Sequence, residues 1–310
     1  MNLSFQQLYE LGGVGLKAFI EITRPHNCLM GGLTSIIGVM VTRQFYIPLY
    51  SQSAFLLILI LSYFTYIFIA AAGNVINDVF DIEIDRINRP DRPIPSGVIS
   101  INQAKIYSIV LWLIGIIFSF ISIPISPAGF WCPIIAIFFS FIGFAYAAKG
   151  KVIGIFGNFM VAISFSFGYI YGGVITGAFN QITSSLAIIT FFLSSFFMLQ
   201  SREIIKGMED VEGDRLRQVK TIAMVYGHRA AAMSAAICGA LAIVFFTSVW
   251  LLTFVNIWFI PFLMLGDISV AVSILILLSG VESSKKQHKA SLFAKIGAFF
   301  GLVGFLIGTI

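Results

Sequence analysis

The sequence predicts an all-α membrane protein, because of its composition, its long uncharged runs and the placement of its basic residues. Hydrophobic residues make up 58% of the 310 positions, and charged residues make up only 11%. Soluble domains carry about a quarter charged residues, so this composition excludes an ordinary soluble enzyme. The chain is therefore expected to cross a membrane many times.

Nine stretches of the chain are long and apolar enough to span a bilayer, which takes about 20 apolar residues in a helix. Pro124 and Pro127 separate the third stretch from the fourth, and polar residues near Gly177 separate the fifth from the sixth. The expected spans are 17–43, 54–77, 104–123, 129–147, 154–177, 184–202, 229–252, 256–280 and 290–309. The predicted fold is a bundle of nine transmembrane helices.

The basic residues indicate how the bundle is oriented. With nine spans, the N-terminus and the loops after the second, fourth, sixth and eighth helices lie on one side of the membrane. That side receives 17 of the 19 Lys and Arg residues, whereas Arg43 falls on the other side and Lys295 inside the last helix. Lysine and arginine are enriched in cytoplasmic loops. We therefore expect a multi-pass protein of the cell membrane, with its N-terminus and these loops in the cytoplasm.

Acidic residues gather in two segments on this predicted cytoplasmic side. In the first segment, Asn77, Asp81 and Asp85 recur every four residues, and Asp78 lies three residues before Asp81. All four side chains share one face if the second helix continues past its apolar run.

The second acidic segment repeats this spacing, because Asp210 and Asp214 are also four residues apart. Stacked carboxylates repel one another unless a cation neutralises them. Mg²⁺ prefers oxygen ligands and combines one or two carboxylates with waters and substrate phosphates. Two such segments facing each other indicate a magnesium–diphosphate site.

Basic residues alternate with these acids and suit phosphate oxygens. They are Arg86, Arg89 and Arg92 in the first segment and Arg202, Lys206, Arg215 and Arg217 in the second. The alternative is that each charged loop only forms salt bridges within itself. The shared spacing, and the extension of an uncharged helix by Asn77 and Asp78, favour the metal–phosphate site.

The same two segments carry a family resemblance. The string NDVFDIEID at 77–85 fits N-D-x-x-D-x-x-x-D, and DVEGD at 210–214 fits D-x-x-x-D. Together with nine helices, this pair resembles the UbiA superfamily of intramembrane prenyltransferases over nearly the whole chain. The resemblance implies one membrane domain over residues 1–310, with helices 1–4 and 5–8 as two halves. A ninth helix joins them around a central cavity that opens sideways to lipid.

Within the superfamily, the strings TRPHN, INRPDRPIPSG and REIIKGMEDVEGD resemble the archaeal digeranylgeranylglyceryl phosphate synthases. That resemblance implies Mg²⁺-dependent transfer of a geranylgeranyl group from geranylgeranyl diphosphate to the free hydroxyl of geranylgeranylglyceryl phosphate. The product carries the second ether bond of archaeal membrane lipids. The expected partners are these two substrates and membrane lipid, and no nucleic acid.

The resemblance also assigns roles to single residues. The expected metal ligands are Asn77, Asp78, Asp81, Asp85, Asp210 and Asp214. The expected substrate-binding residues are Arg24, Asn27, Arg86, Arg89, Arg92, Lys149, Lys151, Arg202 and Lys206. Four residues are expected to take part in catalysis, namely Asp78, Asp81, Asp210 and Tyr146.

Two of these assignments also have a chemical basis. Tyr146 lies about one helical turn from Lys149, and an aromatic face stabilises a cation held over the ring, such as an allylic carbocation. Lys149 and Lys151 suit a phosphate carried by the acceptor, but they are equally well explained as positively charged anchors at a cytoplasmic helix end.

Other functions share part of this pattern. Prenylation of an aromatic acceptor in quinone biosynthesis, or of a haem or chlorophyll macrocycle, would use the same diphosphate site. An ion-coupled transporter would place its acids near the middle of the membrane. Both acidic segments instead lie at predicted cytoplasmic helix ends, and Asp267, to which we assign no role, is the one acid clearly inside a later span.

Overall fold

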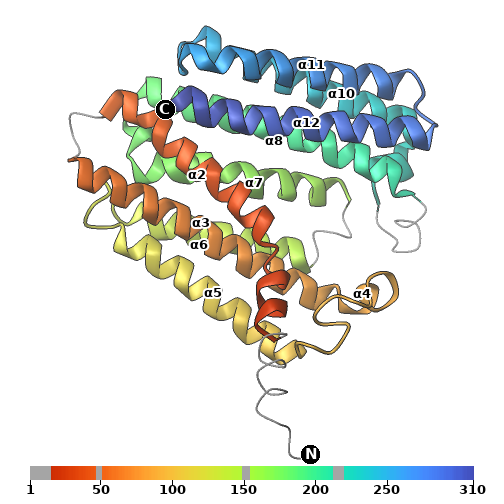
Figure 1. The fold of residues 1–310 in the computed structure, drawn as a ribbon, viewed down its shortest axis with the longest axis horizontal. Coiled ribbons are helices and arrows are strands. Elements are labelled where there is room, and N and C mark those ends of the chain that lie inside the picture. The colour runs from red at the N-terminus through yellow and green to blue at the C-terminus, as the bar shows by residue number, and fades with distance from the viewer. Residues whose placement is uncertain (1–14, 47–50, 149–153, 212–219) are drawn as a thin grey trace, which may run out of the picture.

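The computed structural model of the chain describes residues 15–46, 51–148, 154–211 and 220–310, which form helices and loops and no strand. Nine helices in these ranges have 18 residues or more. They are α2 (Pro25–Tyr46), α3 (Gln52–Phe80), α5 (Ile101–Ile121), α6 (Trp131–Ala148), α7 (Ile155–Ile175), α8 (Ile182–Glu209), α10 (Ile222–Leu251), α11 (Ile260–Leu278) and α12 (Ser284–Thr309). Figure 1 shows these helices side by side, with α11 and α10 at one edge of the bundle and α5 at the other.

Eight of these nine described helices are long and apolar enough to cross a membrane, and α2 is the exception. Polar side chains of α2, among them Thr34, Ser35 and Thr42, are buried inside the bundle. Their hydroxyls donate hydrogen bonds to backbone carbonyls of the same helix, such as Thr34 Oγ1 to Gly31 O at 2.5 Å. Because α2 packs on α3, α7, α8 and α12, protein rather than lipid surrounds much of it. The predicted all-α membrane fold is confirmed, and the count of nine spans is approximate.

The first predicted span, 17–43, is not one continuous helix, so that prediction was wrong. The chain is helical over 15–22, turns at Thr23 and begins α2 at Pro25. Arg24 lies between the two parts in the left-handed region, with φ 52°. Proline has no backbone N–H, and its ring disfavours helical geometry in the preceding residue. The break at Arg24 lies beside the first acidic segment.

Two helices extend further than the apolar residues alone predicted. α3 was expected to end at residue 77 and continues to Phe80, and α8 was expected to end at residue 202 and continues to Glu209. A short helix, α4 (Ile82–Asn88), follows α3 directly. The first acidic segment therefore begins within the last turn of α3, and the second begins directly after the last turn of α8. In addition, α10 begins before its predicted start at residue 229 and has a kink at Gly227, where φ is 84°.

Glycines on both α2 and α7 allow these helices to cross closely. A Cβ atom added to Gly172 would lie 2.4 Å from the backbone oxygen of Ser35, and one added to Gly38 would lie 2.5 Å from that of Tyr169. Separations below 3 Å require a backbone to shift, so the position of α2 depends on the absence of these side-chain atoms.

We expect Gly172→Ala to lower the melting temperature of the detergent-purified protein. An extra methyl group in a filled contact costs about 1–3 kcal/mol. The matched control is Gly143→Ala on α6, where an added Cβ would have nothing within 4 Å. Alanine forms helices better than glycine, so the control should melt at or above the wild-type temperature. Equal melting temperatures for Gly172→Ala and the wild type would contradict the close crossing of α2 and α7.

Candidate active site

Three carboxylates of the first acidic segment converge where α3 ends. Asp78 lies in the last turn of α3, Asp81 occupies the junction with α4, and Asp85 lies on α4. Each offers one oxygen, and these three oxygens lie within 4.8 Å of one another. Asp78 and Asp85 are buried and Asp81 is half-buried. The predicted shared face is therefore present, although the helix is interrupted at Asp81.

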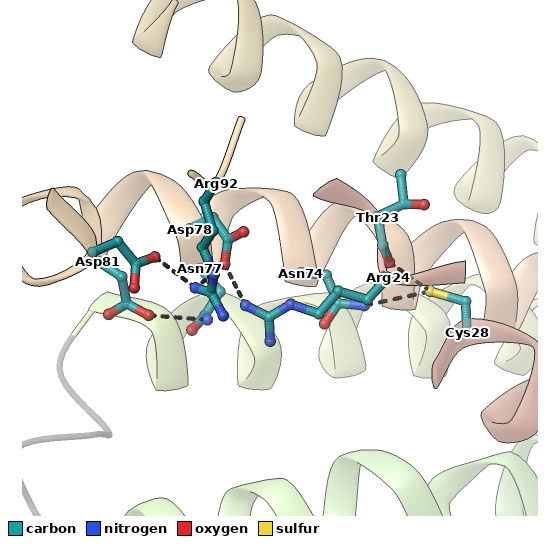
Figure 2. A network of polar contacts seen from close by, with 9 residues as sticks. Thr23, Arg24, Cys28, Asn74, Asn77, Asp78, Asp81 and Arg92 are labelled. Atoms are coloured by element: carbon teal, nitrogen blue, oxygen red, sulfur yellow. Dashed lines mark hydrogen bonds and ion pairs between the residues drawn. The ribbon is translucent and has the colours of Figure 1, made fainter. Parts of the chain in front are cut away.

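Two arginines neutralise part of this buried negative charge. Arg24, at the break before α2, donates a hydrogen bond to Oδ1 of Asp78. Arg92, in the loop after α4, donates to Oδ2 of Asp85 at 2.5 Å and approaches Oδ1 of Asp78 at 3.4 Å. Figure 2 shows both guanidinium groups meeting at Asp78. A buried carboxylate needs such partners, because removing it from water is costly.

A small polar network holds the break at Arg24 against α3. The side-chain amide of Asn74 donates to the backbone oxygen of Thr23 at 2.8 Å, and the Cys28 thiol donates to the same oxygen at 3.1 Å. Asn74 Nδ2 also lies 3.4 Å from the Cys28 sulfur (Figure 2). Asn74 thus ties the start of α2 to the helix that carries Asp78. Asn74 was not among the predicted site residues, although an amide one turn before Asn77 in an uncharged run was a visible signal.

The oxygen atoms of this cluster suit a hard divalent cation. Asn77 Nδ2 donates to Oδ2 of Asp81 at 3.3 Å, and Asn77 Oδ1 is buried without a hydrogen-bond partner among the described residues. A buried amide oxygen normally has a partner. One unpartnered amide oxygen beside three convergent carboxylates is the all-oxygen ligand set that Mg²⁺ prefers. The residues present therefore fit a magnesium ion.

The second acidic segment follows the last turn of α8. Asp210 caps α8, and its backbone N–H donates to the oxygen of Lys206 at 3.0 Å. The Asp210 side chain is exposed, and among the described residues it does not belong to the cluster of Asp78, Asp81 and Asp85. Five predicted residues of the second segment and of the loop before α7 lie outside the described residues, namely Lys149, Lys151, Asp214, Arg215 and Arg217.

A cavity of about 1320 Å³ lies within the bundle, and residues of several helices line it near these two segments. Its lining includes six of the predicted site residues: Arg24, Asn27, Asn77, Tyr146, Arg202 and Lys206. Much of the remaining lining is apolar or aromatic, as at Phe141, Phe246 and Phe305. The cavity thus combines polar and cationic residues near the ends of α3 and α8, such as Asn77, Arg202 and Lys206, with a largely apolar lining suited to hydrocarbon.

Three of the described residues predicted to bind substrate do not line this cavity, namely Arg86, Arg89 and Arg92. Arg86 and Arg89 are both exposed. Arg86 forms an ion pair with Glu83 at 3.1 Å on the exposed side of α4. Exposed ion pairs of this kind contribute about 0–1 kcal/mol, so this pair leaves Arg86 largely available to other anions.

The described bundle has a carboxylate cluster that fits Mg²⁺, cations such as Arg24 and Lys206 in the cavity lining, and a largely apolar cavity. These features define a class of membrane proteins suited to a molecule with a hydrocarbon part and an anionic head. The UbiA prenyltransferase family model matches residues 33–303, and the chain belongs to that family. It is therefore a prenyltransferase.

Several homologous proteins resemble the chain over almost its whole length. The digeranylgeranylglyceryl phosphate synthase of Saccharolobus solfataricus is 36% identical, and the match covers 96% of this chain and 98% of the relative. The enzyme of the same name from Sulfolobus acidocaldarius is 37% identical, with 96% and 99% covered.

Solved structures of related proteins also superpose on this chain over most of its length. A structure of digeranylgeranylglyceryl phosphate synthase superposes with a TM-score of 0.76 at 30% identity, covering 96% of this chain and 99% of that one. A UbiA homologue from Archaeoglobus fulgidus, bound to GPP and Mg²⁺, superposes with a TM-score of 0.64 at 18% identity, covering 93% of this chain and 99% of that one. At that identity, the second likeness concerns the fold alone.

Proposed function

We propose that this prenyltransferase moves a geranylgeranyl group from geranylgeranyl diphosphate to the free hydroxyl of geranylgeranylglyceryl phosphate. The observation that carries the proposal is the cluster of Asp78, Asp81 and Asp85 beside a largely apolar cavity of about 1320 Å³. The names of the full-length relatives support the choice of substrates. Prenylation of an aromatic acceptor would need the same acidic cluster, but none of these relatives carries such a name.

Both acidic segments serve the diphosphate in this proposal. The residues that would hold Mg²⁺ are Asn77, Asp78, Asp81 and Asp85 from the first segment, with Asp210 and Asp214 from the second. Bound magnesium would supply positive charge that stabilises the departing diphosphate. Arg202 and Lys206 line the facing wall of the cavity and would bind diphosphate oxygens from that side.

In this proposal, the cavity lining protects the reactive prenyl carbocation until the acceptor attacks it. An allylic diphosphate reacts when its C–O bond ionises, and cationic groups that are preorganised around the leaving oxygen lower that barrier. The apolar lining excludes water from the carbocation, and the ring of Tyr146 would face it from α6. The diphosphate thus leaves with the electron pair of the broken C–O bond, the acceptor hydroxyl oxygen forms the new C–O bond to the carbocation, and the hydroxyl proton passes to a diphosphate oxygen.

The acceptor brings a phosphate of its own, which requires further cations. Arg24 lines the cavity, and Asn27 lies one turn further along α2. We assign Asn27, with Lys149 and Lys151, to the acceptor side, and Arg24, which contacts Asp78, to the diphosphate. We also propose that the acidic segments face the cytoplasm, which the bias of basic residues supports. The division into two four-helix halves plus α12 remains part of this proposal.

The direct test is product formation by the purified protein in detergent. With both geranylgeranyl substrates and Mg²⁺, mass spectrometry should detect digeranylgeranylglyceryl phosphate, with one diphosphate released per product. Chelation should stop the reaction, and added Mg²⁺ should restore it. A phenolic acceptor without a phosphate should give at least about 100-fold less product, because the acceptor-binding bases would remain unpaired. Turnover with the phenol alone would favour the quinone-pathway alternative.

The cavity also predicts how donor length is sensed. Several lining residues on α5 and α6 are exposed, including Ile109, Ile137 and Phe141, as expected where the cavity opens between helices. A prenyl tail that leaves between these helices ends in lipid and meets no closed floor. Each missing isoprene unit then removes only apolar contact area, at about 25 cal/mol per Å².

We therefore expect C15 and C20 diphosphates both to react, with kcat/KM falling smoothly as the tail shortens. The measurement is kcat/KM for C10, C15, C20 and C25 donors with one acceptor. A sharp limit, with C20 accepted and both C15 and C25 refused, would mean that the tail lies in a closed pocket.

A further inference from the structure

Arg24 and Arg92 bind the same carboxylates that we assign to magnesium. Both arginines contact Oδ1 of Asp78, and Arg92 also contacts Oδ2 of Asp85 at 2.5 Å. These contacts come from two separate parts of the chain, the break before α2 and the loop after α4. A carboxylate oxygen that accepts hydrogen bonds from two guanidinium groups must lose at least part of these contacts before it can ligate a metal ion.

Charge makes simultaneous occupancy by the metal and both arginines unfavourable. The three carboxylates carry three negative charges, and the two arginines supply two positive charges. A divalent ion added to this arrangement would give a net positive cluster, with like charges on shared oxygens in a partly buried site. Repulsion between such charges is strong where water is scarce. The metal and the guanidinium groups should therefore compete for Asp78 and Asp85.

Both arginines are more exposed than the carboxylates that they contact, so their side chains are freer to move. Their side chains are 32% and 20% exposed, whereas those of Asp78 and Asp85 are 6% and 8% exposed. Arg24 also lines the cavity that receives the substrates. Neither arginine lies inside a spanning helix, so each side chain can turn without disturbing helical hydrogen bonds.

The backbone at Arg24 supports this interpretation. A non-glycine residue at φ 52° persists only where its surroundings enforce it, and such strain is concentrated at functional sites. The network of Asn74, Thr23 and Cys28 enforces it here. The strained backbone places Arg24 where its side chain both contacts Asp78 and lines the cavity.

We propose that Arg24 and Arg92 are internal counter-cations that occupy Asp78 and Asp85 before the metal arrives, and that they move to phosphate oxygens when metal and diphosphate bind together. Metal and diphosphate then bind cooperatively, because the diphosphate gives the displaced arginines a new partner. The inference rests on the proposed function for the identity of the anion. It adds that these arginines weaken binding of the metal alone.

The test measures metal binding without turnover. Mn²⁺ is titrated into the full-length detergent-purified protein and followed by electron paramagnetic resonance, with and without inorganic diphosphate. Without diphosphate, Arg24→Gln and Arg92→Gln should each bind Mn²⁺ about tenfold more tightly than the wild type. Diphosphate should tighten Mn²⁺ binding about tenfold or more in the wild type, within the usual range of coupling between two ligands, and much less in either variant.

Two controls separate competition from loss of folding. Arg43→Gln changes an arginine at the far end of α2, which lies over the ring of Phe55, and should leave Mn²⁺ affinity unchanged. Arg92→Lys keeps the positive charge and should restore part of the competition. Unchanged or weaker Mn²⁺ binding in folded Arg24→Gln and Arg92→Gln would overturn the proposal. Absence of prenyl transfer alongside tighter Mn²⁺ binding would contradict the proposed function and leave this inference standing.

Discussion

Replacing Asp81 with alanine should lower kcat at least about 100-fold while the protein still folds and inserts. Asp81 lies between Asp78 and Asp85 in the three-carboxylate cluster and accepts from Asn77. Removing one preorganised electrostatic group from an active site typically costs about 10²–10³ in rate. The helix junction itself should survive, because the backbone N–H of residue 81 still donates to the oxygen of Asn77.

The measurement is kcat and KM for geranylgeranyl transfer, together with the melting temperature of the same preparation. Asp91→Ala is the matched control, because Asp91 is an exposed acid in the loop after α4 and lies outside the cluster. It should retain activity within about twofold, as expected for a surface change away from the site. Near-normal activity of Asp81→Ala would mean that the three-carboxylate cluster is not needed for prenyl transfer.

Replacing Asp210 with alanine should cause a loss of similar size, although the structure shows Asp210 exposed and outside the cluster. Asp210 ends α8, whose last turns place Arg202 and Lys206 on the cavity wall. If one diphosphate bridges the two walls, each acidic segment is needed for the same step. The loss should therefore appear in kcat, because the contact is needed at the transition state.

Glu282→Ala is the control for this second variant, because Glu282 is an exposed acid in the loop between α11 and α12. The double variant Asp81→Ala/Asp210→Ala should be little slower than either single variant, since residues that act as one unit are not additive. If the rate losses of the two single variants instead multiply in the double variant, the two acidic segments would act as separate sites.

Hydropathy predicted most of the fold, because it depends on a property that each residue carries by itself. The spans over α3, α5 and α6 were predicted within a few residues of their observed bounds. Deviations occurred where a local rule acted against the average: Pro25 interrupts the first span, and α3 and α8 continue into acidic segments because helical hydrogen bonding extends past the apolar run.

Sequence spacing predicted the shared face of Asn77, Asp78, Asp81 and Asp85, because that face is local. The pairing of Arg24 with Asp78 joins residues 54 positions apart and depends on how α2 packs against α3. No periodicity contains that information. The relation of Asp210 to the first segment is of the same kind, so its role as a ligand stays a prediction.

Whether the two acidic segments form one metal–diphosphate site is tested by an experimental structure of the protein with Mn²⁺ and a non-hydrolysable geranylgeranyl diphosphate analogue, using the anomalous signal of the metal. We expect metal peaks at ligand distance from Asp81 and from Asp210, with the diphosphate between the two segments and the tail in the cavity. A diphosphate bound by basic residues alone, with no metal peak at either segment, would contradict a shared site.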